Sequence, residues 1–294
     1  MLREILRGTG VALVTPFKDD KSIDFDALQA VINFVIEGGV QYIVTLGTTG
    51  ETPTLSKEEK LDIIQATFST VSGRVPVVIG IGGNSTHEVI KEIDAFPTEK
   101  ATAILSASPY YNKPSQEGIF QHYKALASAT TKPIILYNVP GRTGSNINVA
   151  TTVRLAIEVD TIAGMKEASG NMAQCMQLLR DKPQEFMVVS GDDALALPQI
   201  ACGMDGIISV AANAFPKDFC RMVASALAGD FTGARTINND LMPGYNLLFA
   251  ENNPAGVKAF LSEMGIIKNH LRLPLVPLSA AIQQQAIEYL ATLK

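Results

Sequence analysis

A single lysine closes an otherwise apolar stretch of this chain. Lys166 follows residues 161–165, whose aliphatic character is typical of a strand buried on both faces. Lysine is rarely buried without a reason, and burial disfavours its ammonium form. The neutral amine can attack a carbonyl carbon and form an imine. The alternative is an ammonium that reaches solvent and pairs with Glu167, and the position alone favours neither reading.

Other side chains could serve a reaction at that amine. Tyr137 ends the apolar run 133–138 and could pass protons through its phenol, although an ordinary core role is its alternative. Thr48 and Thr49 lie between two glycines and could offer hydroxyl and backbone N–H groups to a small carboxylate. Their alternative is a tight turn that only uses such residues. Arg142 suits bidentate carboxylate binding, against the alternative of a solvated loop charge.

Other chemistries have weaker support in the residue pattern. The three histidines are expected to be exposed or to cap helices, and they lack metal-ligand spacing: His87, His122 and His270. The glycines after residue 79 lack the third glycine of a dinucleotide-binding loop. Asp192 and Asp193 are predicted to cap the next helix rather than to form an acid pair. We therefore expect neither a metal site nor a dinucleotide-binding site.

Composition limits the class of protein. The chain has 294 residues, of which 47% are hydrophobic and 18% charged, so it can bury a large core. Its net charge of −5 disfavours a nucleic-acid partner, whose phosphates attract basic surfaces. No apolar run is long enough to span a bilayer, and the N-terminus lacks the pattern of a signal peptide. Three widely spaced cysteines form no disulfide framework, so we expect a soluble, cytoplasmic protein.

The candidate side chains must be positioned by a regular succession of elements. Eight short apolar runs, bounded by Gly, Pro or polar residues, predict buried strands at 10–15, 41–46, 75–80, 101–106, 133–138, 161–166, 186–190 and 206–210. From Thr15 to Ser209 their seven intervals average about 28 residues, the size of a strand–helix unit. Amphipathic segments lie between them, one of which begins with a capping box at Ser56 and Glu59.

Eight such units predict an α/β fold, a (β/α)8 TIM barrel with a C-terminal helical region. We assign residues 1–214 to the barrel and 215–294 to that region, which includes the last barrel helix. The region is expected to be helical with breaks at four prolines: Pro243, Pro254, Pro274 and Pro277. Catalytic groups of such barrels lie at the carboxyl ends of the strands, where Lys166, Tyr137, the two threonines and Arg142 would meet.

These residues, in this order, match a known family. The chain resembles dihydrodipicolinate synthases, which belong to the class I pyruvate-dependent aldolases. The resemblance is carried by residues 47–51 (GTTGE), 108–112 (SPYYN), 137–143 (YNVPGRT), 164–168 (GMKEA), 190–193 (SGDD) and 271–274 (LRLP). It covers essentially the whole chain, and it implies the same barrel fold with a C-terminal helical region.

The resemblance also implies a reaction and a role for individual residues. Lys166 would form a Schiff base with pyruvate, and the resulting enamine would attack aspartate semialdehyde before ring closure. Tyr137 would donate and accept protons through a relay of Thr48 and Tyr111, the latter supplied by a neighbouring subunit. The remaining substrate contacts would come from Thr49, from the backbone of Gly191 and Ile208, and from Arg142, which would receive the carboxylate of the semialdehyde. No cofactor is implied, and a homo-oligomer, a dimer of dimers, is expected.

Two other functions stay open at this point. Sibling lyases, which cleave sialic acid or 2-keto-3-deoxy sugar acids, share the lysine, the tyrosine and a related glycine–threonine loop. The second threonine, the Tyr110–Tyr111 pair and Arg142 argue for the synthase. A barrel that only binds a keto acid as a sensor or scaffold has no need of an imine-forming lysine.

A pocket that regulates some family members is partly matched. Many bacterial members are inhibited by lysine at a dimer interface, and Asn84, Glu88 and Tyr110 match positions of that pocket. Lys57 and Lys60 stand where lysine-sensitive members often carry histidines. Two added cations would repel a lysine ligand, so we predict weak or absent feedback inhibition.

Overall fold

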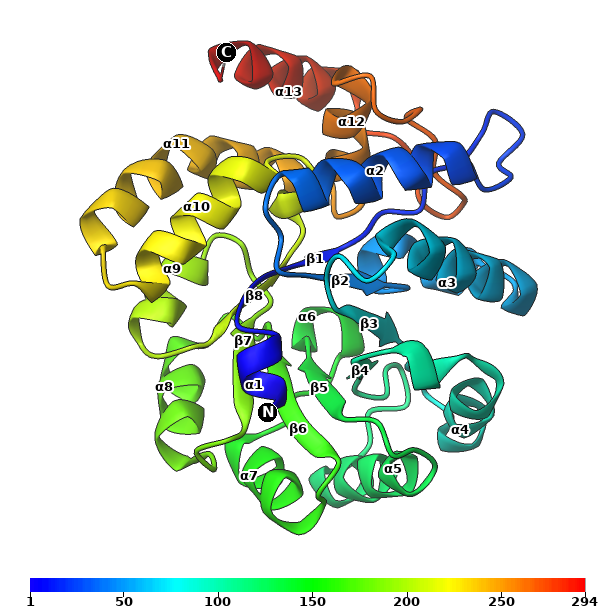
Figure 1. Ribbon diagram of the computed structural model, residues 1–294, viewed down its shortest axis with the longest axis vertical. Coiled ribbons are helices and arrows are strands. Elements are labelled where there is room, and N and C mark those ends of the chain that lie inside the picture. The colour runs from blue at the N-terminus through cyan, green and yellow to red at the C-terminus, as the bar shows by residue number, and fades with distance from the viewer. Residues whose placement is uncertain (294) are drawn as a thin grey trace.

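Eight parallel strands close into a barrel in the computed structural model, which describes residues 1–293. The strands follow one another around the barrel in chain order (Figure 1). They are β1 (Gly8–Ala12), β2 (Tyr42–Thr45), β3 (Val77–Gly80), β4 (Ala103–Ala107), β5 (Ile134–Asn138), β6 (Ile162–Glu167), β7 (Met187–Ser190) and β8 (Gly206–Ser209). All eight predicted strands are confirmed, and the predicted (β/α)8 barrel with them.

The strands are apolar throughout because both of their faces are buried. Residues that alternate along each strand separate into two clusters. One fills the barrel interior and includes Val44, Ile135 and Val189, and the other packs outward against the helices and includes Ile43, Leu136 and Val188. Side chains that point inward at the carboxyl ends of the strands therefore reach the mouth of the barrel.

Helices surround this barrel and cap its ends. Those of the barrel half are α1 (Leu2–Ile5), α2 (Phe25–Glu37), α3 (Lys57–Val71), α4 (Thr86–Ala95), α5 (Gln116–Ser128), α6 (Pro140–Thr143), α7 (Val149–Glu158), α8 (Met172–Asp181) and α9 (Ala196–Ala201). The Ser56 hydroxyl accepts from the Glu59 N–H and the Glu59 carboxylate accepts from the Ser56 N–H, which confirms the predicted capping box. Leu2 and Leu6, in and after α1, pack into the interior cluster at the opposite end from the strand carboxyl ends.

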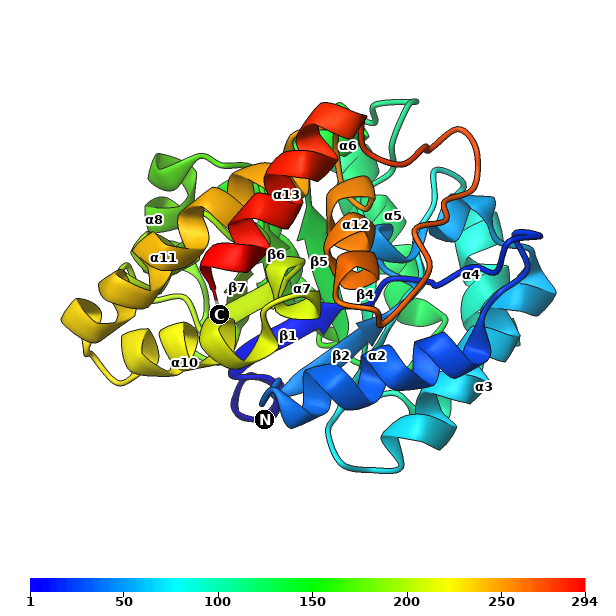
Figure 2. The same cartoon turned by 90° about the horizontal axis from the view of Figure 1, so that it is seen from above.

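The chain ends in a helical region, as predicted. It comprises α10 (Pro216–Leu227), α11 (Phe231–Phe249), α12 (Ala255–Glu263) and α13 (Ala280–Thr292), which lie together along one side of the barrel (Figure 2). The break expected at Pro243 is wrong, because α11 continues through it. Buried side chains on both sides of the proline, Leu241 and Tyr245 among them, hold the two halves of α11 in place. A division into units at residue 214 stays a prediction.

Candidate active site

A cavity of about 800 Å³ opens at the carboxyl ends of the strands. It is lined by residues at or just after the carboxyl ends of β2, β5, β6, β7 and β8, and by the end of α11. Six of the predicted site residues line it: Thr48, Thr49, Tyr137, Arg142, Lys166 and Gly191. Side chains from five strand ends therefore meet at one place, as barrel geometry requires.

Lys166 and Tyr137 are neighbours across the barrel wall. They pair directly in the register of β5 and β6, so both side chains point to the same face. Lys166 Nζ lies 4.3 Å from the centroid of the Tyr137 ring. Both residues are nearly buried, with 5% and 8% of their surface exposed. An amine and a phenol thus share the floor of the cavity.

The proposed pairing of Lys166 with Glu167 is not found. Successive strand residues point to opposite faces, which sends the Glu167 carboxylate outward. It is fully buried there and accepts hydrogen bonds from Asn138 Nδ2 at 2.9 Å, Gln174 Nε2 at 3.2 Å and the Ser169 N–H at 2.6 Å. Among residues 1–293 no ion pair or hydrogen bond occupies the Lys166 amine, so it is free to meet a substrate carbonyl.

The threonine loop is a short 3-10 turn over Thr48–Gly50, and neighbouring threonines hold its carbonyl groups by hydrogen bonds. Thr15 Oγ1 donates to the Gly50 carbonyl at 2.8 Å, and Thr52 Oγ1 donates to the Gly47 carbonyl at 2.9 Å. Thr49 Oγ1 accepts a hydrogen bond of 2.9 Å from Asn253 Nδ2. The loop is therefore more than a tight turn, because its hydroxyls lie on the cavity and one of them is held by a distant residue.

Asn253 is a site residue that the sequence did not reveal. It precedes α12, and its carbonyl accepts from Arg142 Nη2 at 3.3 Å while its side chain reaches Thr49. Its Oδ1 atom is buried and has no hydrogen-bond partner within residues 1–293. The contacts of Asn253 thus connect the threonine loop with Arg142. The Asn252–Asn253–Pro254 stretch carried no motif or periodicity from which this could be predicted.

Arg142 lies at the rim of the cavity. It belongs to the short helix α6 and is exposed, so its guanidinium can meet a ligand without first breaking an ion pair. A planar guanidinium at such a rim suits a carboxylate. Its only hydrogen bond within residues 1–293 is the one to Asn253.

Gly191 and Ile208 differ in their relation to the cavity. Gly191 lines it, and a methyl group added there would lie 2.8 Å from Lys166 Cε and 2.6 Å from the Ala168 methyl. Only glycine leaves room for the lysine side chain at this point. Ile208 has 1% of its surface exposed, and its side chain packs inside the barrel with Tyr137. A backbone contact of Ile208 with substrate stays a prediction.

Tyr111 points away from the cavity of its own chain. It has 89% of its surface exposed and a left-handed backbone with φ of 71°. The adjacent Tyr110, with 40% of its surface exposed, lines a second cavity of about 320 Å³, which also reaches Thr48 and Tyr137. The two tyrosines therefore serve different surfaces.

Of the three residues of the predicted regulatory pocket, Tyr110 lines this second cavity, whereas Asn84 and Glu88 are not among the residues that line it. Asn84 and Glu88 are exposed, and Glu88 pairs with Lys91 at 2.9 Å. The hydrogen bond from Lys91 is the main reason that the pKa of the Glu88 carboxyl lies below its usual range. Lys60 lines the cavity and pairs with Glu92 at 2.7 Å, so its charge is largely compensated. The sequence predicted that Lys57 and Lys60 would both repel a lysine ligand. After the compensation of Lys60, this repulsion rests on the exposed Lys57.

Asp192 and Asp193 do not cap α9. Asp192 Oδ1 accepts from the Ala194 N–H within a turn at the cavity wall. Asp193 is buried and accepts from Ser209 Oγ at 2.6 Å and from the N–H groups of Val210 and Ala211. Burial raises the pKa of its carboxyl to about 6, although these hydrogen bonds lower it. Asp193 thus ties the loop after β7 to the loop after β8.

His122 also differs from its prediction. It is buried in α5, where Thr86 Oγ1 lies 2.9 Å from its Nδ1, and burial lowers its pKa to about 4.

Within residues 1–293 no group of three or more His, Cys, Asp or Glu side chains could hold a metal ion. No helix of that part of the chain is long and apolar enough to cross a membrane.

Known proteins resemble this chain along its whole length. The family model described as the dihydrodipicolinate synthetase family matches residues 5–293. A 4-hydroxy-tetrahydrodipicolinate synthase of Parabacteroides distasonis is 51% identical over 98% of this chain and 97% of its own. The crystal structure of a chloride-inhibited dihydrodipicolinate synthase of Acinetobacter baumannii with pyruvate has a TM-score of 0.94 at 42% identity, over 97% of this chain and 98% of that one.

A third comparison concerns lysine. The dihydrodipicolinate synthase of Cyanidioschyzon merolae, solved with lysine bound, has a TM-score of 0.94 at 35% identity, over 98% of both chains. The sibling lyases are not favoured by these matches. With a full-length family match, relatives at about half identity and a cavity that brings the lysine, tyrosine and threonines together, this chain belongs to the dihydrodipicolinate synthetase family.

Proposed function

We propose that this chain condenses pyruvate with L-aspartate 4-semialdehyde and gives 4-hydroxy-tetrahydrodipicolinate, with Lys166 as the Schiff-base residue. The supporting observation is the Lys166 amine, nearly buried, free of any carboxylate within residues 1–293, and 4.3 Å from the Tyr137 ring at the floor of the cavity. The family and the names of its relatives point to the same reaction.

The chemistry proceeds through a covalent imine. The Lys166 nitrogen attacks C2 of pyruvate, a C–N bond forms, and water leaves to give the imine. Loss of a proton from C3 gives an enamine, whose C3 forms a C–C bond to the aldehyde carbon of the second substrate. The amino group of that substrate then attacks C2, and the C–N bond to Lys166 breaks as the ring closes. The lysine is thereby regenerated, and no external oxidant or reductant is consumed.

The surrounding residues supply proton transfer and carboxylate binding. Tyr137 is placed to exchange protons with the carbinolamine and with the aldehyde oxygen, because its phenol lies beside the amine. Thr48 carries these protons onward, and Thr49 with the backbone of Gly191 and Ile208 holds the carboxylate of pyruvate. Arg142 holds the carboxylate of the semialdehyde at the rim.

Tyr111 completes the relay from a second copy of the chain. Its phenol is 89% exposed and lies outside its own cavity, which suits a residue that enters the cavity of a neighbour. A homo-dimer is therefore the minimal active unit, and a dimer of dimers the expected assembly. The mass from light scattering and the condensation activity are measured for wild type and for Tyr111→Ala. A fully active monomer would contradict this assembly. A cytoplasmic location stays a prediction of the sequence.

A substrate comparison tests the reaction. The purified protein is offered pyruvate with aspartate semialdehyde in one assay, and sialic acid or 2-keto-3-deoxy-gluconate in others. We expect pyruvate consumption only with the semialdehyde, and its loss in Lys166→Ala. Cleavage of a sugar acid at a higher kcat/KM than the condensation would overturn the proposal.

A further inference from the structure

A buried carboxylate ends the threonine loop without touching the cavity. Glu51 follows the Thr48–Gly50 turn in a left-handed conformation with φ of 54°, and 1% of its surface is exposed. Its Oε1 lies 2.5 Å from Lys258 Nζ, and both side chains are 0% exposed. Its Oε2 accepts from the Arg272 N–H at 3.1 Å. Both partners belong to the C-terminal region, more than 200 residues away along the chain.

Lys258 belongs to α12, the helix that Asn253 precedes. Its ammonium donates to the His270 carbonyl at 2.8 Å and lies 4.1 Å from the centroid of the Phe17 ring. Burial lowers its pKa to about 8, against the opposing effect of Glu51, so the ammonium form still prevails at pH 7. The threonine loop is thus contacted twice from this part of the chain, by Asn253 just before α12 on Thr49 and by Lys258 within α12 on Glu51.

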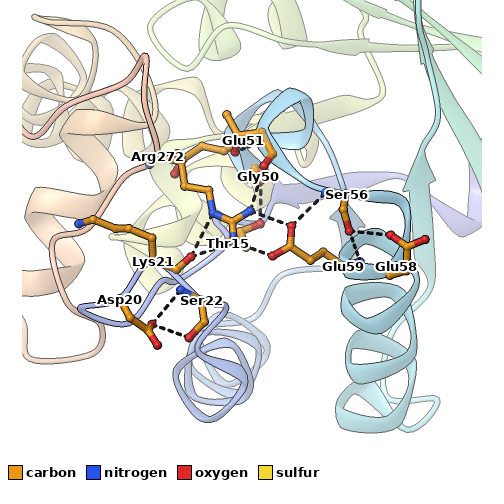
Figure 3. A network of polar contacts seen from close by, with 11 residues as sticks. Thr15, Asp20, Lys21, Ser22, Gly50, Glu51, Ser56, Glu58, Glu59 and Arg272 are labelled. Atoms are coloured by element: carbon orange, nitrogen blue, oxygen red, sulfur yellow. Dashed lines mark hydrogen bonds and ion pairs between the residues drawn. The ribbon is translucent and has the colours of Figure 1, made fainter.

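Arg272 fixes the segment that supplies the second contact. Its guanidinium makes a bidentate pair with Glu59 at 2.6 and 2.7 Å and donates to the Thr54 carbonyl at 2.9 Å. Figure 3 shows the guanidinium between Lys21, Glu51 and Glu59, at the point where three distant parts of the chain converge. These contacts of the Arg272 side chain therefore hold the Arg272 backbone N–H in place for its hydrogen bond to Glu51.

Stability alone does not explain this arrangement. Desolvation offsets most of the attraction in a buried ion pair, and apolar residues of similar size are often as stable there. An ion pair does, however, fix the position of its members through short, directional contacts. Thr48 and Thr49 precede Glu51 by only three and two residues. A fixed position of Glu51 therefore also restricts the positions of their hydroxyl groups at the cavity.

We propose that Glu51 is a positioning residue of the reaction, held by Lys258 and by the backbone of Arg272 so that the hydroxyls of Thr48 and Thr49 are aligned with the substrates. The inference rests on the proposed function, in which these threonines serve proton transfer and carboxylate binding. The C-terminal region is thereby part of the catalytic apparatus, through a contact that never reaches the substrate.

The test separates alignment from stability. Wild type is compared with three variants: Glu51→Gln, the uncharged double variant Glu51→Gln/Lys258→Met, and Glu59→Gln. Borohydride reduction with pyruvate counts the chains that form the imine, and kcat is then expressed per trapped chain. Lys268→Met is the matched control, because it removes the exposed pair with Asp19, 2.9 Å long, from the same segment without reaching the threonine loop.

Positioning predicts full trapping but a lower kcat per trapped chain in both Glu51 variants, by about 10²-fold for a displacement on the order of 1 Å. The loss should persist in the double variant even where its melting temperature is restored, and Glu59→Gln should show a smaller loss. The Lys268→Met control should keep the wild-type kcat.

Equal kcat per trapped chain in wild type and in the Glu51 variants would overturn the inference and leave the proposed function intact. If the Glu51 variants do not fold, an unchanged kcat in Glu59→Gln overturns it in the same way. Absence of any trapped imine in wild type would instead contradict the proposed function itself.

Discussion

The buried Asp193 carboxyl predicts a specific dependence of stability on pH. Its pKa is raised from 3.8 to about 6, mainly because burial disfavours the carboxylate. The folded chain therefore holds the proton more tightly than the unfolded chain does. The stability linked to this group is fully present below pH 3.8 and is lost as pH rises through about 6.

The magnitude follows from the same two values. A raised pKa of about 6 against 3.8 gives a slope of about 1.4 kcal/mol per pH unit between them, or about 3 kcal/mol in total. Between pH 7 and pH 5 the gain in the free energy of unfolding from this group is about 1 kcal/mol. The variant Asp193→Asn has no titratable group here and should lack the gain.

Urea denaturation of both proteins at pH 7 and pH 5, at one protein concentration, measures the difference directly. The other carboxyls titrate alike in both proteins, so they cancel when the variant is subtracted from wild type. We expect the stability of wild type relative to the variant to increase at pH 5. A difference that is independent of pH, or larger at pH 7, would refute the assignment of the raised pKa to Asp193.

Three further predictions concern the cavity. Gly191→Ala should lower the rate of imine formation with pyruvate, because its methyl group would meet Lys166 Cε, and stopped-flow trapping that finds the wild-type rate would contradict this. Asn253→Ala should lower kcat/KM about fivefold through the loss of one hydrogen bond to Thr49, with an unchanged steady-state value as the opposing result. Free lysine should inhibit weakly, and Lys57→His should strengthen inhibition more than Lys60→His does, since Glu92 already compensates Lys60; inhibition of wild type at low-millimolar lysine would rule this out.

The barrel and its reactive floor could be predicted from the sequence because their signals are local. Each strand is a short apolar run, and the residue at its end faces the cavity by the geometry of the fold alone. That rule was enough for Lys166 and Tyr137, which are brought together by the pairing of adjacent strands. It could not decide between an amine at the cavity and an ion pair with Glu167, which only the observed alternation of faces resolves.

Residues whose role depends on distant contacts could not be predicted. Asn253 and Lys258 lie in the C-terminal region, for which the sequence predicted only helices and breaks at prolines, and nothing in that pattern shows that the region reaches the threonine loop. The break predicted at Pro243 was wrong because the packing of buried side chains on both sides of it outweighs the tendency of proline to end a helix. His122 could have been placed better, since it follows the buried Ile119 by three residues on the same helix face.

The most direct measurement concerns the Lys166 nitrogen. Wild-type protein and Lys166→Ala are each treated with pyruvate and borohydride, and their intact masses are compared, followed by peptide mapping of the wild type. We predict one reduced pyruvate adduct per wild-type chain, located on Lys166, and no adduct in the variant. An adduct on another lysine, or none in the wild type, would contradict a Schiff base at the floor of this barrel.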